Sequence, residues 1–327
     1  MKPETTIEGN ARLLTYHEAL EDTALGKILS AEDVKNAPEG YRSALAGMEE
    51  GTVIVVEPHA RAKITVERKS PPGRAFGTFF IFGENSHSTV FYRTALQEST
   101  RECRGIFLSK LAVAHCCFLQ ADNEKALSTV GLVARLGECS QLKFLNSNIG
   151  GNEKRDAFLF LQDRRASRCE HFEAGLARQG QKFFLDSDHL HTAPDTYSRS
   201  VFKYATAGNS QVNVDGKVTI EQAAPGSDTH LLAKSLLLSE NSISKVIPML
   251  FVRNSDVAAG HGSSMTPLQD EELFYLRSRG IGESESKLLV LQGFLRDLIS
   301  RSEMDAGALG TLEAELEKDA HSIFPRD

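Results

Sequence analysis

The 327-residue sequence has no tryptophan, no long apolar run and no cysteine pattern typical of a disulfide framework. Crossing a bilayer takes about 20 consecutive apolar residues, so we expect no membrane span. The opening residues, Met-Lys-Pro-Glu-Thr-Thr, precede no apolar segment, and a secretory signal is not expected. An odd number of cysteines, two of them adjacent, favours a reducing compartment, and we expect a cytoplasmic protein. They are Cys103, Cys116, Cys117, Cys139 and Cys169.

Strong positive charge is also missing, since the formal net charge is −7 and no basic stripe stands out. A nucleic-acid partner is therefore not expected. Neither G-x-x-x-x-G-K-[ST] nor G-x-G-x-x-G occurs, so any nucleotide would have to be bound by a partner.

Short β-rich runs separated by turn residues fill the middle of the chain. Before them we expect an N-terminal helical segment over residues 1–50, with short helices in 11–25 and 31–48. The strands occupy residues 51–264, and no helix of ten or more residues separates most of them, which disfavours a βαβ sheet. Turn signals that continue for two hundred residues favour a solenoid of short strands, although this pattern leaves a sandwich or barrel open.

The pattern changes to helical periodicity in residues 265–327. Thr266, Pro267 and Gln269 suit a helix start, and Leu273, Phe274 and Leu276 would form its apolar stripe. Gly280 suits the left-handed stop. A second helix should begin near Glu283 and Glu285, with Leu288, Leu291, Leu295 and Leu298 on one face, and a third is possible over 305–320.

Residues from about 196 to 299 resemble the C-terminal half of the SufB/SufD family of iron–sulfur cluster assembly proteins. The resemblance lies in an ordered series rather than in any single motif. The series runs from Thr196-Tyr197-Ser198-Arg199-Ser200 through Pro248-Met249-Leu250 and His261-Gly262 to Phe274-Tyr275-Leu276-Arg277-Ser278-Arg279-Gly280.

This resemblance implies a right-handed parallel β-helix followed by a helical domain. It implies a non-catalytic scaffold that works with the ATPase SufC, docked on the helical domain. It also implies pairing with SufB, or with a second copy, through the β-helix. An iron–sulfur cluster would be shared transiently with that partner rather than bound by the chain alone.

The residues near His261 resemble SufD more than SufB. The family pattern has His-Gly-Ala-Thr in SufD and His-Glu-Ala-Thr in SufB, and this chain has His261-Gly262-Ser263-Ser264. In SufB a cysteine proposed to carry the cluster lies nine residues before the histidine, where this chain has Val252. Phe251 and Ala259-Gly260 also depart from the usual SufD residues.

His261 is the candidate iron or cluster ligand, because neutral imidazole binds iron. A structural histidine in a turn or interface is the alternative. The cysteines show no C-x₂-C spacing, and we expect them to be small packing residues, with Cys116 and Cys117 on opposite faces of a strand. His189 and His191 would share a face on a strand and could bind a metal there, but Asp186, Ser187 and Asp188 just before them indicate a turn and favour a solvated loop pair.

Tyr275, Arg277, Arg279 and Phe294 are the candidate partner-binding residues of the helical domain, since Arg and Tyr are common interface anchors. The alternative is that the two arginines form ion pairs with nearby acidic residues. A second function class is a secreted-type β-helix enzyme acting on acidic polysaccharide. The absence of tryptophan platforms, paired acids and a signal peptide counts against it.

Overall fold

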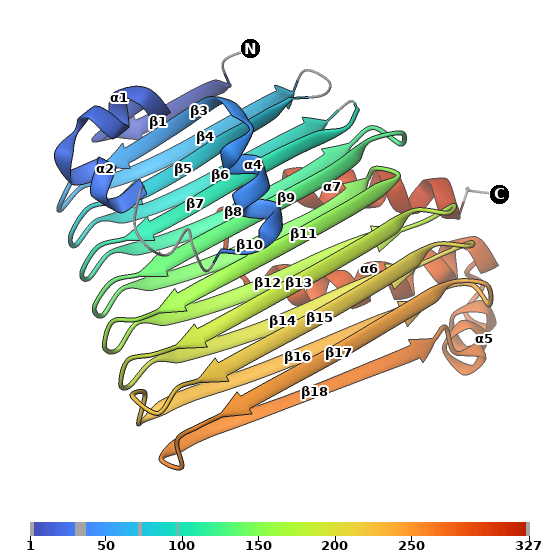
Figure 1. Ribbon diagram of the computed structural model, residues 1–327. Coiled ribbons are helices and arrows are strands. Elements are labelled where there is room, and N and C mark those ends of the chain that lie inside the picture. Colours follow the sequence, from blue (N-terminus) through green and yellow to red (C-terminus); the bar gives the residue numbers. More distant parts are fainter. Residues whose placement is uncertain (1–2, 30–36, 71–73, 97, 325–327) are drawn as a thin grey trace.

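The computed structural model describes residues 3–29, 37–70, 74–96 and 98–324, which form a two-sheet β-solenoid with helices at its sides (Figure 1). Sheet A contains β1 and the even-numbered strands from β4, and sheet B contains β2 and the odd-numbered strands from β3. From β3 onward, neighbouring strands within a sheet are parallel, because each coil adds one strand to each sheet. The predicted mainly β architecture, a β-helix with a C-terminal helical segment, is confirmed.

From β3 onward, successive strands alternate between the two sheets. In chain order, the elements are β1 (Glu4–Gly9), β2 (Ala11–Thr15), α1 (Tyr16–Glu21), α2 (Thr23–Leu29), α4 (Glu39–Ala46), β3 (Met48–Val56), β4 (Arg61–Ser70), β5 (Ala75–Phe82), β6 (His87–Leu96), β7 (Thr100–Leu108), β8 (Val113–Asp122), β9 (Leu127–Leu136), β10 (Gln141–Gly150), β11 (Glu153–Gln162), β12 (Arg168–Ala177), β13 (Lys182–His191), β14 (Tyr197–Thr206), β15 (Gln211–Ile220), β16 (Ser227–Leu237), β17 (Ile243–Val252), β18 (Val257–Pro267), α5 (Asp270–Ser278), α6 (Glu283–Arg301) and α7 (Ala306–Ile323).

One corner of the solenoid carries a structural repeat that no strict sequence repeat marks. At this corner a residue adopts the left-handed conformation, with φ between 53° and 59°, every 26 to 29 residues. Its N–H donates to a carbonyl of the next coil, at 2.8 to 3.1 Å, and a buried Ala, Ser or Thr follows it. The repeated coil-to-coil bond offsets the strain of the conformation. The residues are His59, Asn85, Leu111, Cys139, Ala166 and Asp195.

The apolar core lies between the two sheets and is continuous along the solenoid. Aromatic rings contact one another along the core in tilted or edge-to-face arrangements, with centroids of Phe80 and Phe118 5.6 Å apart and those of Phe118 and Phe144 5.1 Å apart. Each ring contact contributes beyond the area that it buries. The core thus ties successive coils together as well as the two sheets.

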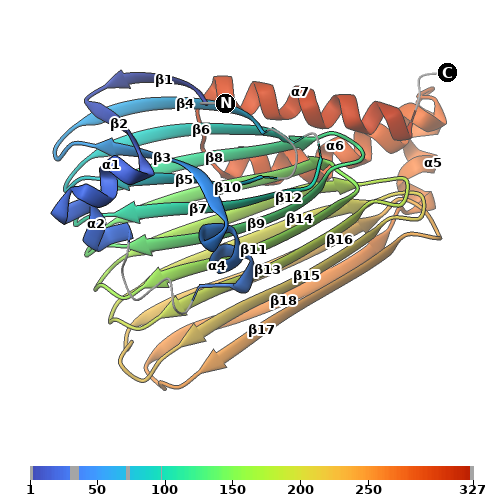
Figure 2. The ribbon, with the colours of Figure 1, turned by 45° about the horizontal axis from the view of Figure 1, so that its top comes forward.

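Helices cover the outer faces of both sheets (Figure 2). On sheet B, α4 approaches the backbone of β9 so closely that a Cβ on Gly131 would lie 2.2 Å from Cα of Tyr41. On sheet A, α6 and α7 bury an apolar cluster that includes Leu145 and Phe172 of the sheet. Leu288, Leu291, Leu295 and Leu298 face it, as their spacing predicts.

We expected a short helix within residues 11–25, and this expectation is wrong for residues 11–15. Residues Ala11–Thr15 are strand β2, which pairs antiparallel with β3, and a second antiparallel strand, β1, precedes it. Pairing with an open sheet edge outweighs local helical preference here. The helix expected over 31–48 is seen as α4; positions 31–36 lie outside the described residues.

The expected start of the first C-terminal helix is also wrong. Thr266 and Pro267 belong to β18, where they pair with Leu236 and Leu237. The helix α5 therefore begins at Asp270 instead. The stop at Gly280 is confirmed, with φ of +85°, and helices α6 and α7 lie where the sequence predicts them.

Candidate functional site

The C-terminal end of the solenoid is open. Strands β17 and β18 are the last strands of the two sheets. In the described part of the chain, each of them pairs with a neighbouring strand on one side only. Unpaired N–H and C=O groups on such edges are a template for another chain. The two edges lie one core-width apart, so a second two-sheet end could satisfy both at once.

His261 lies on the inward-facing row of this last coil. It pairs in register with Leu231, which is buried in the core, and residues in register on parallel strands point to the same face. Val252 lies on the inward row of the facing strand, in register with Ile220 of the core. The structure thus places both residues of the predicted motif at the open end of the core, where no further coil covers them.

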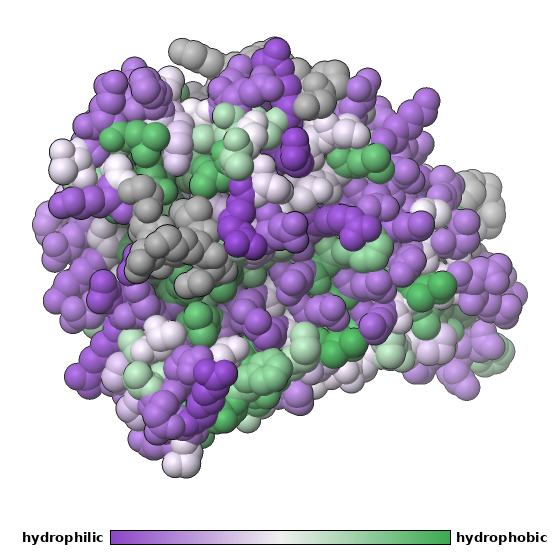
Figure 3. Space-filling view, in the orientation of Figure 1, coloured by the Kyte–Doolittle hydropathy of each residue, from purple (hydrophilic) through white to green (hydrophobic). Residues whose placement is uncertain are grey.

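The surface around His261 is mainly apolar. Val252 is 43% exposed on β17 and Met265 is 52% exposed on β18, both on the inward rows. Phe251, 49% exposed, lies on the outer face of β17. In the space-filling view hydrophobic surface runs along the lower part of the molecule, near β17 (Figure 3). An apolar patch on a strand edge is typical of a protein interface.

The last coil offers few ligands for iron. Among its described inward residues, His261 carries the one imidazole, and no thiol is present. Among residues 3–29, 37–70, 74–96 and 98–324, no three His, Cys, Asp or Glu side chains gather to hold a metal ion. His261 thus offers one imidazole, fewer ligands than an iron or cluster site needs.

The cysteines lie away from this end. Cys116 faces the core and Cys117 faces helices α6 and α7, so the two neighbours do point to opposite sides. Burial raises the pKa of Cys117 to about 12, and it raises the pKa of Cys116 and Cys169 well above that of a free thiol. Protonated, buried thiols are poor metal ligands and nucleophiles, as expected for packing residues.

Helix α5 presents the candidate partner-binding residues. Tyr275 is 58% exposed, and Arg279 stacks on its ring with the guanidinium carbon 5.3 Å from the centroid. Arg277 lies 3.9 Å from Glu283, a long ion pair. Phe274, expected in the apolar stripe, is instead 74% exposed, and Leu273 is the one buried residue of α5. The sequence therefore missed Phe274 as an exposed aromatic residue of this helix.

Phe294 does not belong to this exposed face. It lies on α6 beside Lys203 of β14, with the ammonium 5.0 Å from the ring centroid. It also lines a groove of about 330 Å³ between the ends of β16 and β18 and helix α6. A partner that entered this groove would contact Phe294.

Ion pairs hold helices α6 and α7 to sheet A. In each of them the basic residue belongs to the solenoid and the acidic residue belongs to the C-terminal helical region. Lys203 Nζ lies 2.7 Å from Asp297 and donates to the carbonyl of Phe294 at 2.8 Å. Arg178 lies 2.8 Å from Asp319, and both side chains are about nine-tenths buried. The remaining pairs are Lys63–Asp305, Arg93–Glu315 and Lys143–Glu303. Helix α5 has no such pair to the solenoid among the described residues.

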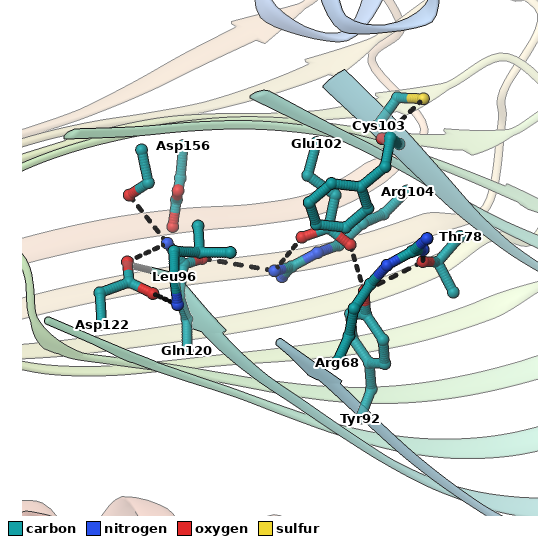
Figure 4. A network of polar contacts seen from close by, with 12 residues as sticks. Arg68, Thr78, Tyr92, Leu96, Glu102, Cys103, Arg104, Gln120, Asp122 and Asp156 are labelled. Carbon is teal, nitrogen blue, oxygen red and sulfur yellow. Dashed lines mark hydrogen bonds and ion pairs between the residues drawn. The ribbon is translucent and has the colours of Figure 1, made fainter. Parts of the chain in front are cut away.

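A charged network fills part of the solenoid interior (Figure 4). The Arg104 guanidinium lies 2.7 Å from Glu102, and Tyr92 donates to the same carboxylate at 2.5 Å. Lys154 Nζ lies 3.1 Å from Asp122 and donates to the carbonyl of Gln120 at 2.9 Å. Burial alone would lower the pKa of Arg104, but the charge and hydrogen bond of Glu102 raise it.

Glu173 joins this network to a buried pair of histidines. It accepts from Asn146 at 3.0 Å and from Tyr204 at 3.2 Å, and His171 Nε2 lies 2.7 Å from it. Desolvation by burial raises the pKa of Glu173 to about 8 and lowers that of His171 to about 3. Near neutral pH the glutamate is thus protonated and His171 uncharged.

The expected solvated loop at His189 and His191 is wrong. Both side chains lie on strand β13 and are buried in the interior, 1% and 0% exposed. His189 Nε2 lies 3.3 Å from His171 Nδ1, and His191 contacts the hydroxyls of Thr196 and Ser198. Interior hydroxyls and histidines provide the partners that a loop would have found in water.

No helix in the described part of the chain has the length and apolarity of a membrane span.

Comparison with known proteins identifies the family of this chain. Residues 41–294 match the family model described as "SUF system FeS cluster assembly, SufBD core domain". The match takes in the whole solenoid from β3 to β18 and most of α6. The chain belongs to the SufBD family. The resemblance drawn from residues 196–299 is confirmed at the family level.

Curated SufBD relatives are similar over part of their length. A SufBD family iron–sulfur cluster assembly protein of Mycobacterium leprae is 26% identical over 229 residues, 70% of this chain and 26% of that protein. One from Mycobacterium tuberculosis is 31% identical over 212 residues, 60% of this chain and 52% of the relative. The chain therefore spans about a quarter to a half of the length of these relatives.

Proposed function

We propose that the chain is a non-catalytic scaffold subunit of a SUF iron–sulfur assembly complex, closer to SufD than to SufB. The open end of the solenoid carries this proposal, because it combines two unpaired strand edges with one inward imidazole and no thiol. In this role it pairs end to end with SufB, or with a second copy, and contributes His261 to a cluster that the partner largely holds. A reducing, cytoplasmic setting fits the buried free thiols.

We further propose that the ATPase SufC docks on the exposed face of α5, at Phe274, Tyr275, Arg277 and Arg279. The face combines a large exposed aromatic area with two arginines, the residue types common at binding hot spots. Family membership favours this scaffold function over the polysaccharide-cleaving enzyme.

Replacing Phe274 with aspartate should reduce recovery of SufC with the tagged chain by at least tenfold, because a charge would enter the centre of the docking face. Deleting residues 265–327 is a poorer test, since α6 and α7 cover the apolar face of sheet A. Co-purification from cells that express both proteins measures the effect.

The matched control is Leu127→Asp, which places the same charge on another exposed leucine, 45% exposed and remote from α5. It should retain SufC. Equal recovery with Phe274→Asp and with the unchanged chain would rule out α5 as the docking face.

A further inference from the structure

The two ends of the solenoid are built differently. At the C-terminal end, β17 and β18 pair in parallel with β15 and β16, and in the described chain their outer edges are unpaired. At the other end, β1 pairs antiparallel with β4, and β2 pairs antiparallel with β3. In the described chain these are the only two antiparallel pairs of the sheets, and both lie at the N-terminal end (Figure 1).

Without β1 and β2 the two ends would be complementary. Each coil already accepts the next one through parallel pairing and a continuous core, so a bare first coil could accept the last coil of another molecule. Such a head-to-tail contact does not close on itself, and it produces a filament. Solenoid proteins therefore need terminal elements that stop stacking.

The first strands have the properties of such a terminal element. β1 has six residues, whereas most strands of the solenoid have ten, and it exposes the charged side chains of Glu4 and Glu8. Ile7 and Thr5 turn inward, in register with Ile64 and Val66, and cover the core. Short, charged edge strands resist further pairing.

A tight turn at Gly9 places these strands over both sheets. Gly9 has φ of +104°, and a Cβ there would lie 2.1 Å from the carbonyl oxygen of Arg61. Only glycine fits this position, and the chain then crosses from sheet A to sheet B within one residue. Beyond the turn, Arg12 pairs with Glu57 at 2.5 Å and fastens β2 to the first coil.

We propose that β1 and β2 form a cap that confines association to the β17–β18 end, so that assembly stops at two solenoids. In the absence of SufB, the occupant of the open end is one second copy of this chain, whose own open end offers the same two edges. This inference rests on the end-to-end pairing proposed above. It adds that the N-terminal strands, rather than weak affinity, prevent growth into filaments.

The test compares the unchanged chain with two cap variants, Gly9→Val and the double variant Thr5→Lys/Ile7→Lys. Light scattering after size exclusion gives the mass, electron microscopy shows filaments, and hydrogen exchange of β1 reports release of the cap. The unchanged chain should never exceed two copies. The cap variants should grow with concentration while circular dichroism shows an intact solenoid.

A second set of variants shows where growth occurs. Adding Val252→Lys and Met265→Lys to a cap variant places charges on the inward row of the open end and should abolish growth. Folded cap variants with a released β1 but no growth would overturn the proposal, as would growth that survives these lysines. A single-copy unchanged chain whose cap variants still grow would refute only the pairing of two open ends.

Discussion

Replacing Arg104 with methionine should lower the free energy of unfolding by about 3–5 kcal/mol, because it leaves a buried carboxylate without its cation. Arg104 is 1% exposed and Glu102 is fully buried, so water cannot replace the lost partner. Tyr92 would remain as one donor to Glu102. Chemical denaturation at neutral pH, monitored by circular dichroism, measures the change.

The control is the double variant Arg104→Met/Glu102→Leu, which removes both charges. Apolar replacement of a whole buried pair is often neutral or stabilising. The double variant should therefore recover most of the lost stability. An Arg104→Met variant that loses less than about 1 kcal/mol would show that Glu102 has another partner or is reached by solvent.

Replacing Glu173 with glutamine should make the protein less sensitive to rising pH. A carboxyl whose pKa is raised from 4.5 to about 8 holds its proton longer in the folded state than in the unfolded chain. Its stabilising contribution is fully present below pH 4.5 and is lost as the pH rises through 8. The loss amounts to about 1.4 kcal/mol per pH unit across this window.

Glutamine keeps the shape and the acceptor oxygen of protonated Glu173 but cannot ionise. Unfolding free energies of the two proteins should thus be similar near pH 5, and the variant should be the more stable one by several kcal/mol near pH 9. Burial and the nearby Glu173 carboxyl raise the pKa of Asp156 to about 6, so its titration lies below the pH range in which Glu173 ionises. Parallel stability curves over this range would contradict a protonated Glu173.

The immediate surroundings of Glu173 support this assignment. Among the described residues its hydrogen-bond partners are Asn146, Tyr204 and His171, and none of them is a cation near neutral pH. Ionising Glu173 would therefore place a charge without a cationic partner in a fully buried site, which is costly.

The sequence predicted the class of the fold because most strands carry apolar side chains that face the core. The strand pattern is weakest where polar or charged side chains face the interior instead. Strand β12, Arg168–Ala177, places His171 and Glu173 in the interior and so lacks the apolar alternation that marks a strand. Pairing between buried charges depends on coils far apart in sequence, and a local pattern cannot show it.

Two further features became visible only through packing. The left-handed corner residues His59 and Leu111 have no common side-chain chemistry, so the repeat is carried by conformation and by the small residue that follows. Phe274 fits a helical apolar stripe, yet it is exposed, because Leu273 is the one residue that α5 buries. Its position and that of His261 show that the candidate site is set by which surfaces the fold leaves uncovered.

Anaerobic reconstitution with iron and sulfide, followed by analysis of both elements, tests the scaffold function most directly. The chain alone should retain little iron. A complex with SufB should retain a cluster, and His261→Ala should lower its iron and sulfide content severalfold while leaving subunit association intact. Stoichiometric iron and sulfide on the isolated chain, unchanged by His261→Ala, would contradict a cluster shared across the open end.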